Sequence, residues 1–202
     1  MERHAPHPVS TDLAQAIGEA RACTLCTAPQ LPLGPKPILQ GAPSARLLII
    51  GQAPGTKAHM SGVPWDDQSG KRLREWIGLS DEQFYNPEVV AIIPAGLCYP
   101  GAAPSGGDNP PIRQCASIWH PRLLPLLKDV RLTLLVGLHA QKLYLKDGMT
   151  LSERVRLHPE GPLLPLPHPS WRVAGWIKQN PWFEAETLPR LQARVQQVLG
   201  ER

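Results

Sequence analysis

The stretch RLLIIGQAPG, residues 46–55, decides the fold class. Its first half is a short continuous apolar run, which is typical of a parallel strand buried on both faces. Its second half places Gly51, Pro54 and Gly55 directly after that run, and these residues permit a tight, stiff turn close to a ligand. Ligands of parallel α/β sheets bind where loops leave the carboxyl ends of the strands. The stretch therefore predicts a buried strand that leads into a functional loop, although an ordinary strand–helix connection has the same pattern.

Other buried strands and helices are predicted on both sides of this stretch. Three further apolar runs read as strands, at 88–93, 132–136 and 163–166. Four stretches show helical spacing of apolar residues, at 11–22, 70–79, 111–128 and 184–199. Strands separated by helices predict an α/β fold, a three-layer sandwich with a central four-stranded parallel sheet flanked by helices. We expect a single domain over residues 1–202, with residues 1–10 flexible.

The composition is that of a globular protein. Hydrophobic residues make up 42% and charged residues 19% of the 202 residues, which excludes a disordered chain. The net charge of +4 and the pI near 9.0 fit a nucleic-acid partner, although many basic proteins bind no anion. No apolar run approaches the roughly 20 residues that span a bilayer, and the first residues lack a secretory h-region. We therefore expect a protein of the reducing cytoplasm, with no membrane partner.

Four cysteines, Cys23, Cys26, Cys98 and Cys115, are the whole complement of the chain. The first two form a C-x2-C pair, and folding must bring the other two to it. In a reducing compartment, four cysteines favour metal ligation over disulfides. They suit either a structural zinc ion or a [4Fe–4S] cluster. The alternative is four unrelated buried thiols.

Two further loops carry aromatic and polar side chains suited to nucleic acid. Trp65 lies between Pro64 and Asp66, where its ring can stack on a planar base or pack in the core. His168 follows the predicted strand 163–166 between two prolines and is rigidly aimed, so it can donate a hydrogen bond to an oxygen that gains charge. Ser170 and Arg172 follow it and can contact phosphates. The alternative for this last segment is an exposed turn.

Together these motifs resemble the uracil-DNA glycosylase superfamily, and within it the iron–sulfur-containing family 4 group. The resemblance extends from about residue 20 to residue 195. It is carried by five features in the same order: CTLC at 23–26, GQAPG at 51–55, SGVPW at 61–65, the cysteine pair 98 and 115, and HPS at 168–170. It implies a base-excision repair enzyme that flips uracil or another deaminated base out of DNA and hydrolyses its N-glycosidic bond. It also implies that the four cysteines hold a [4Fe–4S] cluster, with structural zinc as the alternative, and that the enzyme is a monomer.

The resemblance also implies a role for each motif residue. Gln52 and His168 would be catalytic, the first by positioning water and the second by stabilising the departing base. Trp65 would stack on the flipped base. The remaining predicted substrate-binding residues are Gly51, Ala53, Pro54, Gly55, Asn109, Ser170 and Arg172.

Two positions depart from the family pattern. Family 4 has Glu at the position of Gln52, and Ala53 takes the place of the catalytic Asp of family 1, so Asp66, Asp67 or His59 would have to supply any basicity. Family 4 also reads the uracil edge with an Asn where this chain has Pro94, and Asn109 is the candidate substitute. Three function classes therefore stay open: a glycosylase, a non-catalytic DNA-binding or damage-sensing relative, and a metal or cluster protein without base chemistry.

Overall fold

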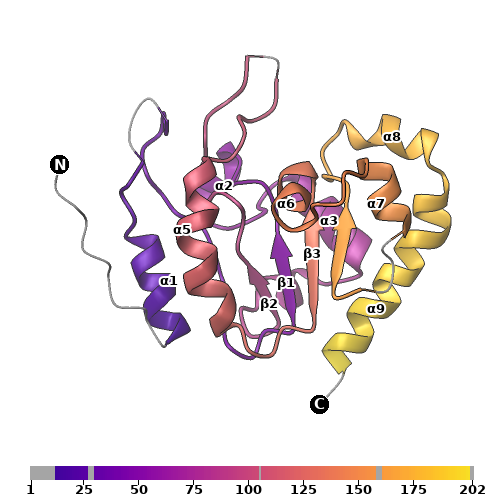
Figure 1. Ribbon diagram of the computed structural model, residues 1–202, viewed down its shortest axis with the longest axis horizontal. Coiled ribbons are helices and arrows are strands. Elements are labelled where there is room, and N and C mark those ends of the chain that lie inside the picture. The colour runs from indigo at the N-terminus through magenta and orange to yellow at the C-terminus, as the bar shows by residue number, and fades with distance from the viewer. Residues whose placement is uncertain (1–11, 27–29, 105, 158–160, 201–202) are drawn as a thin grey trace.

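Four parallel strands form the centre of the molecule (Figure 1). The computed structural model describes residues 12–26, 30–104, 106–157 and 161–200, so the expectation for residues 1–10 lies outside the described residues. The strands are β1 (Leu47–Ile50), β2 (Val90–Ile92), β3 (Leu132–Val136) and β4 (Leu163–Leu166). Their order in the sheet is β2-β1-β3-β4. The prediction of a four-stranded parallel sheet is confirmed.

Helices cover both faces of the sheet. Successive strand side chains point to opposite faces, so each face is apolar and packs against helices in its own core. In β1, Leu47 and Ile49 belong to one core, whereas Leu48 and Ile50 belong to the other. The first core is completed by α3 (Gln68–Ile77), α7 (Leu151–Leu157), α8 (Val173–Gln179) and α9 (Leu188–Gly200). The second is completed by α1 (Leu13–Arg21), α5 (Arg113–Leu123) and α6 (Leu138–Tyr144). This arrangement confirms the α/β three-layer sandwich as a single domain.

The helix boundaries follow local capping residues. Helix α1 starts after Asp12, whose side chain accepts a hydrogen bond from the Ala14 amide at 2.9 Å. Helix α3 starts two residues before the predicted 70–79, because Asp67 caps it and accepts from the Gly70 amide at 2.8 Å. Four short helices were not predicted: α2 (Thr56–Ser61), α4 (Asp81–Tyr85), α7 and α8.

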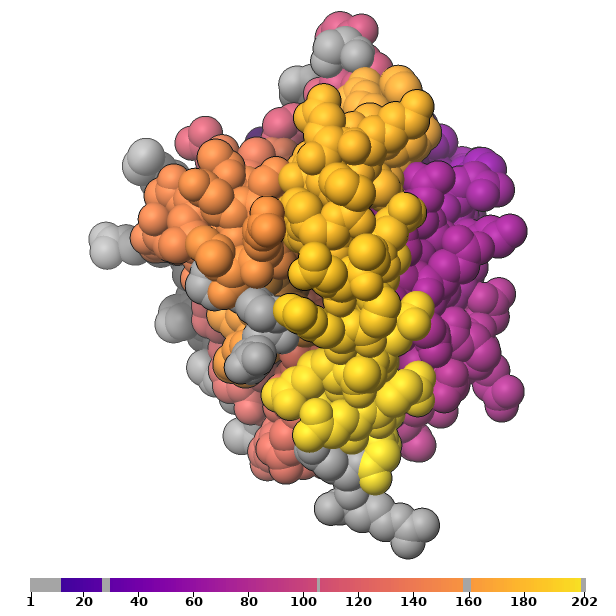
Figure 2. Space-filling model, turned by 90° about the vertical axis from the view of Figure 1, so that its right-hand side faces the viewer, coloured from indigo at the N-terminus to yellow at the C-terminus, as the bar shows by residue number. Residues whose placement is uncertain are grey.

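The C-terminal part of the chain covers one face of the molecule. Residues Phe183–Thr187 form a π-helical turn that runs into α9, and this segment extends down the face shown in Figure 2. On the opposite side of the sheet, a 3₁₀ turn at Leu124–Leu126 extends α5. The predicted helices 184–199 and 111–128 are thus confirmed with interruptions. Within the described part of the chain, no helix has the length and apolar character that crossing a membrane requires.

Strand order fixes where a site can form. The chain leaves β1 toward β2 on one side and leaves the neighbouring strand β3 toward β4 on the other, so the loops at the carboxyl ends of β1 and β3 diverge. Such a divergence opens a crevice at that edge of the sheet. Residues 101–104 and 106–109 project beyond the same edge (Figure 1). They belong to a hairpin closed by a bridge between Ala102 and Asp108, which we call the 101–109 hairpin.

Candidate active site

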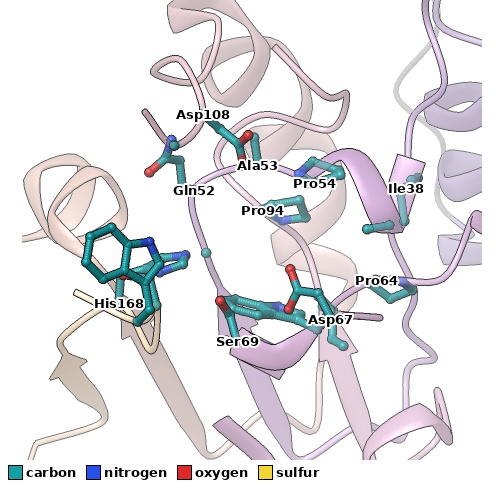
Figure 3. Close-up of a pocket in the computed structure, with 18 of the residues that line it drawn as sticks. Ile38, Gln52, Ala53, Pro54, Pro64, Asp67, Ser69, Pro94, Asp108 and His168 are labelled. Carbon is teal, nitrogen blue, oxygen red and sulfur yellow. The ribbon is translucent and has the colours of Figure 1, made fainter. Parts of the chain in front are cut away.

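A cavity of about 340 Å³ lies at the carboxyl ends of the strands, within the usual size range of small-ligand sites (Figure 3). The loop after β1 forms one wall and the loop after β4 forms another. Nine of the ten residues predicted to be catalytic or substrate-binding line it: Gly51, Gln52, Ala53, Pro54, Gly55, Trp65, His168, Ser170 and Arg172. Motifs more than a hundred residues apart in sequence therefore meet at one site.

Trp65 is held against the wall of the cavity by a strained backbone. Its φ of 58° is the left-handed conformation, which a bulky residue rarely adopts. Gly70 makes this possible, because a Cβ there would lie 1.8 Å from the Trp65 carbonyl oxygen. The Tyr85 hydroxyl donates to the same carbonyl at 3.3 Å. The indole lies over Gly51, where a Cβ would be 2.8 Å from its Cζ2 atom. Trp65 is thus a fixed, half-buried platform that packs against the first core and also lines the cavity.

His168 leans toward this platform from the end of β4. Gly137 directly follows the neighbouring strand β3, and a Cβ there would lie 3.3 Å from the His168 Cβ. The ring centroids of His168 and Trp65 are 5.6 Å apart at an interplanar angle of 31°. Burial lowers the pKa of His168, although the charge of Asp67 opposes this shift. The imidazole is therefore neutral at physiological pH and has one N–H to donate.

The loop that carries His168 is anchored by two arginines. Arg72 of α3 donates from Nη1 to the carbonyl oxygens of Pro169 and Ser170, at 2.9 and 2.8 Å. Arg172 donates to the Gly106 carbonyl at 3.0 Å and so joins this loop to the 101–109 hairpin. No local sequence signal marks Arg72, because its partners lie about a hundred residues away along the chain.

Gln52 and Asn109 connect the hairpin to the loop after β1. The Gln52 side-chain amide donates to the Asn109 backbone carbonyl at 2.9 Å. The Asn109 side chain donates to the carbonyls of Pro100 and Ala102, at 3.1 and 3.3 Å. Asn109 does not line the cavity, so the structure does not place its amide where the sequence suggested a substitute base reader. Both amides instead close the hairpin against the body of the protein.

Two carboxylates line the cavity, Asp67 and Asp108. A Cβ at Gly55 would lie 3.3 Å from Oδ2 of Asp108 and 3.7 Å from Oδ2 of Asp67, so both side chains face the same glycine. Burial and the nearby charge of Asp67 raise the pKa of Asp108. The other two acid–base candidates, Asp66 and His59, do not line the cavity. Sequence reasoning missed Asp108, whose one signal was its place in the glycine-rich segment beside Asn109.

The wall at Pro94 offers no side-chain hydrogen bond. Its ring lines the cavity, and its carbonyl accepts from Nε2 of His120 at 3.0 Å. His120 is buried, and burial lowers its pKa, so a neutral ring donates from Nε2 and pairs with the Tyr144 hydroxyl through Nδ1. This network fixes the backbone at position 94 from behind. Side-chain hydrogen bonds to a ligand must therefore come from other walls of the cavity.

The cleft presents the Trp65 indole with a neutral histidine ring beside it, a combination suited to a planar ligand that stacks on the indole and accepts a hydrogen bond at its edge. A family model described as the uracil DNA glycosylase superfamily matches residues 39–192. The chain belongs to this superfamily. Superfamily membership indicates a DNA glycosylase, and the matched range contains every residue that lines the cavity except Ile38.

The four cysteines of this superfamily member gather around one small apolar cavity beside the hairpin. Cys23 and Cys26 follow α1, Cys98 follows β2 and Cys115 lies in α5. All four are half-buried free thiols, and Leu31, Leu97, Ile112 and Trp119 are among the apolar residues around them. The structure therefore brings together the predicted ligand set. Among the described residues, no group of three or more His, Cys, Asp or Glu side chains is arranged to hold a single metal ion.

N–H groups point at three of these sulfur atoms. The Leu97 amide donates to Cys115 Sγ at 3.3 Å, Gln114 Nε2 donates to Cys26 Sγ at 3.9 Å, and the Lys36 amide donates to Cys98. Such bonds stabilise thiolates that ligate metal or iron–sulfur centres. Burial, with a smaller effect of the neighbouring cysteines, raises the pKa of Cys98 to about 11 and that of Cys115 to about 12. A bound cationic centre would supply the positive charge that buried thiolates need.

Proposed function

We propose that the protein is a DNA glycosylase that excises uracil or another deaminated base by hydrolysing the N-glycosidic bond. One observation carries the proposal: a single cavity combines the GQAPG loop, Trp65 and His168. Superfamily membership supports the reaction class, and the net charge of +4 suits a DNA partner. We further propose that the enzyme acts as a monomer in a reducing compartment.

The base side of the reaction rests on Trp65 and His168. A base flipped out of the stack would lie on the indole, at a cost of a few kcal/mol that is smallest for single strands and mispairs. As the bond between C1′ and N1 breaks, its electron pair moves to the base and C1′ becomes cationic. The neutral His168 imidazole donates its N–H to a base oxygen as negative charge develops there. No protonated histidine is required for this step.

Asp108 would act on the water molecule that attacks the sugar. Asp108 is exposed at the mouth of the cavity, whereas Asp67 is more enclosed, so the sugar would pass closer to Asp108. The oxygen of a water molecule bonds to C1′ as one of its protons passes to the Asp108 carboxylate. That proton then returns through solvent to the departing base. Gln52 supports this arrangement from behind by holding the Asn109 carbonyl at the base of the hairpin.

The cysteine cavity fits the iron–sulfur cofactor that family 4 implies. Cys23, Cys26, Cys98 and Cys115 would hold a [4Fe–4S] cluster, with structural zinc as the alternative. When bound, the group would cross-link the segment after α1 to both flanks of the hairpin and carry out no step of the reaction. Broad visible absorbance in protein purified without oxygen supports the cluster. Colourless protein with one bound zinc ion would contradict it.

The test of the proposed function is a single-turnover excision assay. Oligonucleotides carrying uracil, hypoxanthine or xanthine, each single- and double-stranded, are incubated with excess protein and then cleaved at abasic sites. We expect excision from at least one of them, and none by a His168→Ala variant beyond a small residual rate. Tight DNA binding with every base left intact would favour a damage-sensing relative instead. The observation that favours this second candidate is the Gln52 amide, which cannot accept a proton from water as a carboxylate would.

A further inference from the structure

Deaminated bases share one feature that a protein can read. Uracil, hypoxanthine and xanthine carry a lactam, in which a ring N–H lies next to a carbonyl. Cytosine and adenine instead present an unprotonated ring nitrogen, a hydrogen-bond acceptor, at the corresponding position. An acceptor on the protein therefore favours the lactam and repels cytosine and adenine. Because Pro94 supplies no such acceptor in this chain, another wall of the cavity must do so.

Asp67 has the position and the rigidity for this task. It follows the platform residue Trp65 by two positions and lines the cavity. Its Oδ1 accepts from the Gly70 amide at 2.8 Å, which fixes the carboxylate as the N-cap of α3. Its Oδ2 lies 3.7 Å from the Cβ position of Gly55, on the cavity wall. Figure 3 shows Asp67 and His168 on opposite sides of the cavity, with Asp108 at a third position.

We propose that Asp67 is the base-reading residue: its Oδ2 accepts the lactam N–H of a base that stacks on Trp65, while His168 donates to the adjoining carbonyl. This inference rests on the proposed function of the same cavity. It makes the substrate class the lactam bases, because one carboxylate recognises the N–H that uracil, hypoxanthine and xanthine share. The amide of the family Asn would recognise the N–H and a second carbonyl together. Thymine and guanine carry the same N–H, so Asp67 discriminates against cytosine and adenine only.

The cap geometry makes Asp67→Asn an informative variant. Asn caps helices as well as Asp does, so its Oδ1 keeps the bond to the Gly70 amide and the fold is preserved. The cavity-facing atom then becomes an NH₂ donor, which opposes the lactam N–H and suits the ring nitrogen of cytosine. Asp67→Ser retains a cap and removes the cavity-facing atom. Asp66→Asn is the matched control, since Asp66 is exposed and does not line the cavity.

The experiment measures binding separately from chemistry. Single-stranded oligonucleotides carry one 2′-fluoro-2′-deoxyuridine or 2′-fluoro-2′-deoxycytidine, whose N-glycosidic bonds resist hydrolysis, and Kd is measured by fluorescence anisotropy at one salt concentration. We expect Asp67→Asn to lower the uracil-over-cytosine preference by about 10- to 100-fold, the scale of one good hydrogen-bonding pair. Asp67→Ser should give a smaller loss, and Asp66→Asn none.

The outcomes separate the two proposals. An unchanged preference in Asp67→Asn, with wild-type excision intact, overturns the base-reading role and leaves the glycosylase. A preference that depends on Asp67 in a protein that excises nothing supports base reading and overturns the catalytic proposal. A wild-type protein that binds both oligonucleotides equally overturns the base-reading role.

Discussion

Replacing Gly51 with Ala tests whether the position of the Trp65 indole matters for binding, because Gly51 lies against this ring. The added Cβ would lie 2.8 Å from Cζ2 of Trp65, whereas ordinary contacts begin at 3.4 Å, so the indole must give way by about 0.6 Å. The backbone cannot supply this movement, because Gly70 and Tyr85 fix the Trp65 carbonyl. The ring must therefore tilt into the cavity. We expect a loss of about 1–3 kcal/mol in the free energy of unfolding, the usual cost of overpacking.

Two measurements follow from this tilt. A loss of that size lowers Tm by about 2–10 °C in a domain of this length. Stacking on a correctly placed aromatic ring contributes about 1–3 kcal/mol per base, so affinity for a uracil-containing oligonucleotide should fall by about 10- to 100-fold. The control is Gly18→Ala in α1, where a Cβ meets nothing within 4 Å and helix propensity improves. Wild-type affinity and Tm in Gly51→Ala would show that Trp65 is not the platform.

Three further substitutions and one cysteine change test the remaining roles. His168→Ala should lower the single-turnover rate by about 10²–10³, the effect of losing one charge-stabilising donor, and an unchanged rate would exclude this role. Asp108→Asn should lower the rate by about 10² and remove the decline of the rate at acidic pH, because only deprotonated Asp108 can accept a proton. The raised pKa of Asp108 makes the wild-type rate decline at a higher pH than an ordinary aspartate would. A wild-type pH profile in this variant would contradict the role. Gln52→Glu cannot donate to the Asn109 carbonyl, so we expect a rate about tenfold lower and faster proteolysis of the hairpin, whereas a rate gain would show that a carboxylate is missing at position 52. Cys115→Ser should abolish the visible absorbance of the proposed [4Fe–4S] cluster and lower Tm. Retention of the full absorbance would remove Cys115 from the proposed set of cluster ligands.

The strands could be predicted because burial on both faces produces continuous apolar runs. Each predicted strand run contains the observed strand, and β3 and β4 match to the residue. The short helices could not be predicted from periodicity, since α2 and α4 contain six and five residues and barely repeat a helical turn. A capping box formed by Ser80 and Gln83 marks the start of α4, and this signal was available in the sequence.

The site was predictable where motifs lie in rigid loops and was not where it depends on the hairpin. Asp108 and Asn109 are adjacent, and successive side chains of an extended chain point in opposite directions. Here Asp108 lines the cavity and Asn109 bonds the backbone of its own hairpin. Which of the two faces the cavity depends on the positive φ angles of Gly106 and Gly107, and a sequence does not show these angles. The sequence prediction therefore named the neighbour of the residue that lines the cavity.

Gln52 and Pro94 depart from the family pattern, but other residues of the cavity can replace the groups that are missing at these two positions. If only positions 52 and 94 could supply these groups, the cleft would have no carboxylate to activate water and no side chain to recognise the nucleobase. Asp67 and Asp108 enter the same cavity from other elements, one from the cap of α3 and one from the hairpin. Cys98 and Cys115 flank that hairpin, so the proposed centre bound by the cysteines would help to fix the position of Asp108 but not that of Asp67. If the cysteines hold the proposed centre, its removal should therefore reduce the rate of excision more than it reduces the preference between bases.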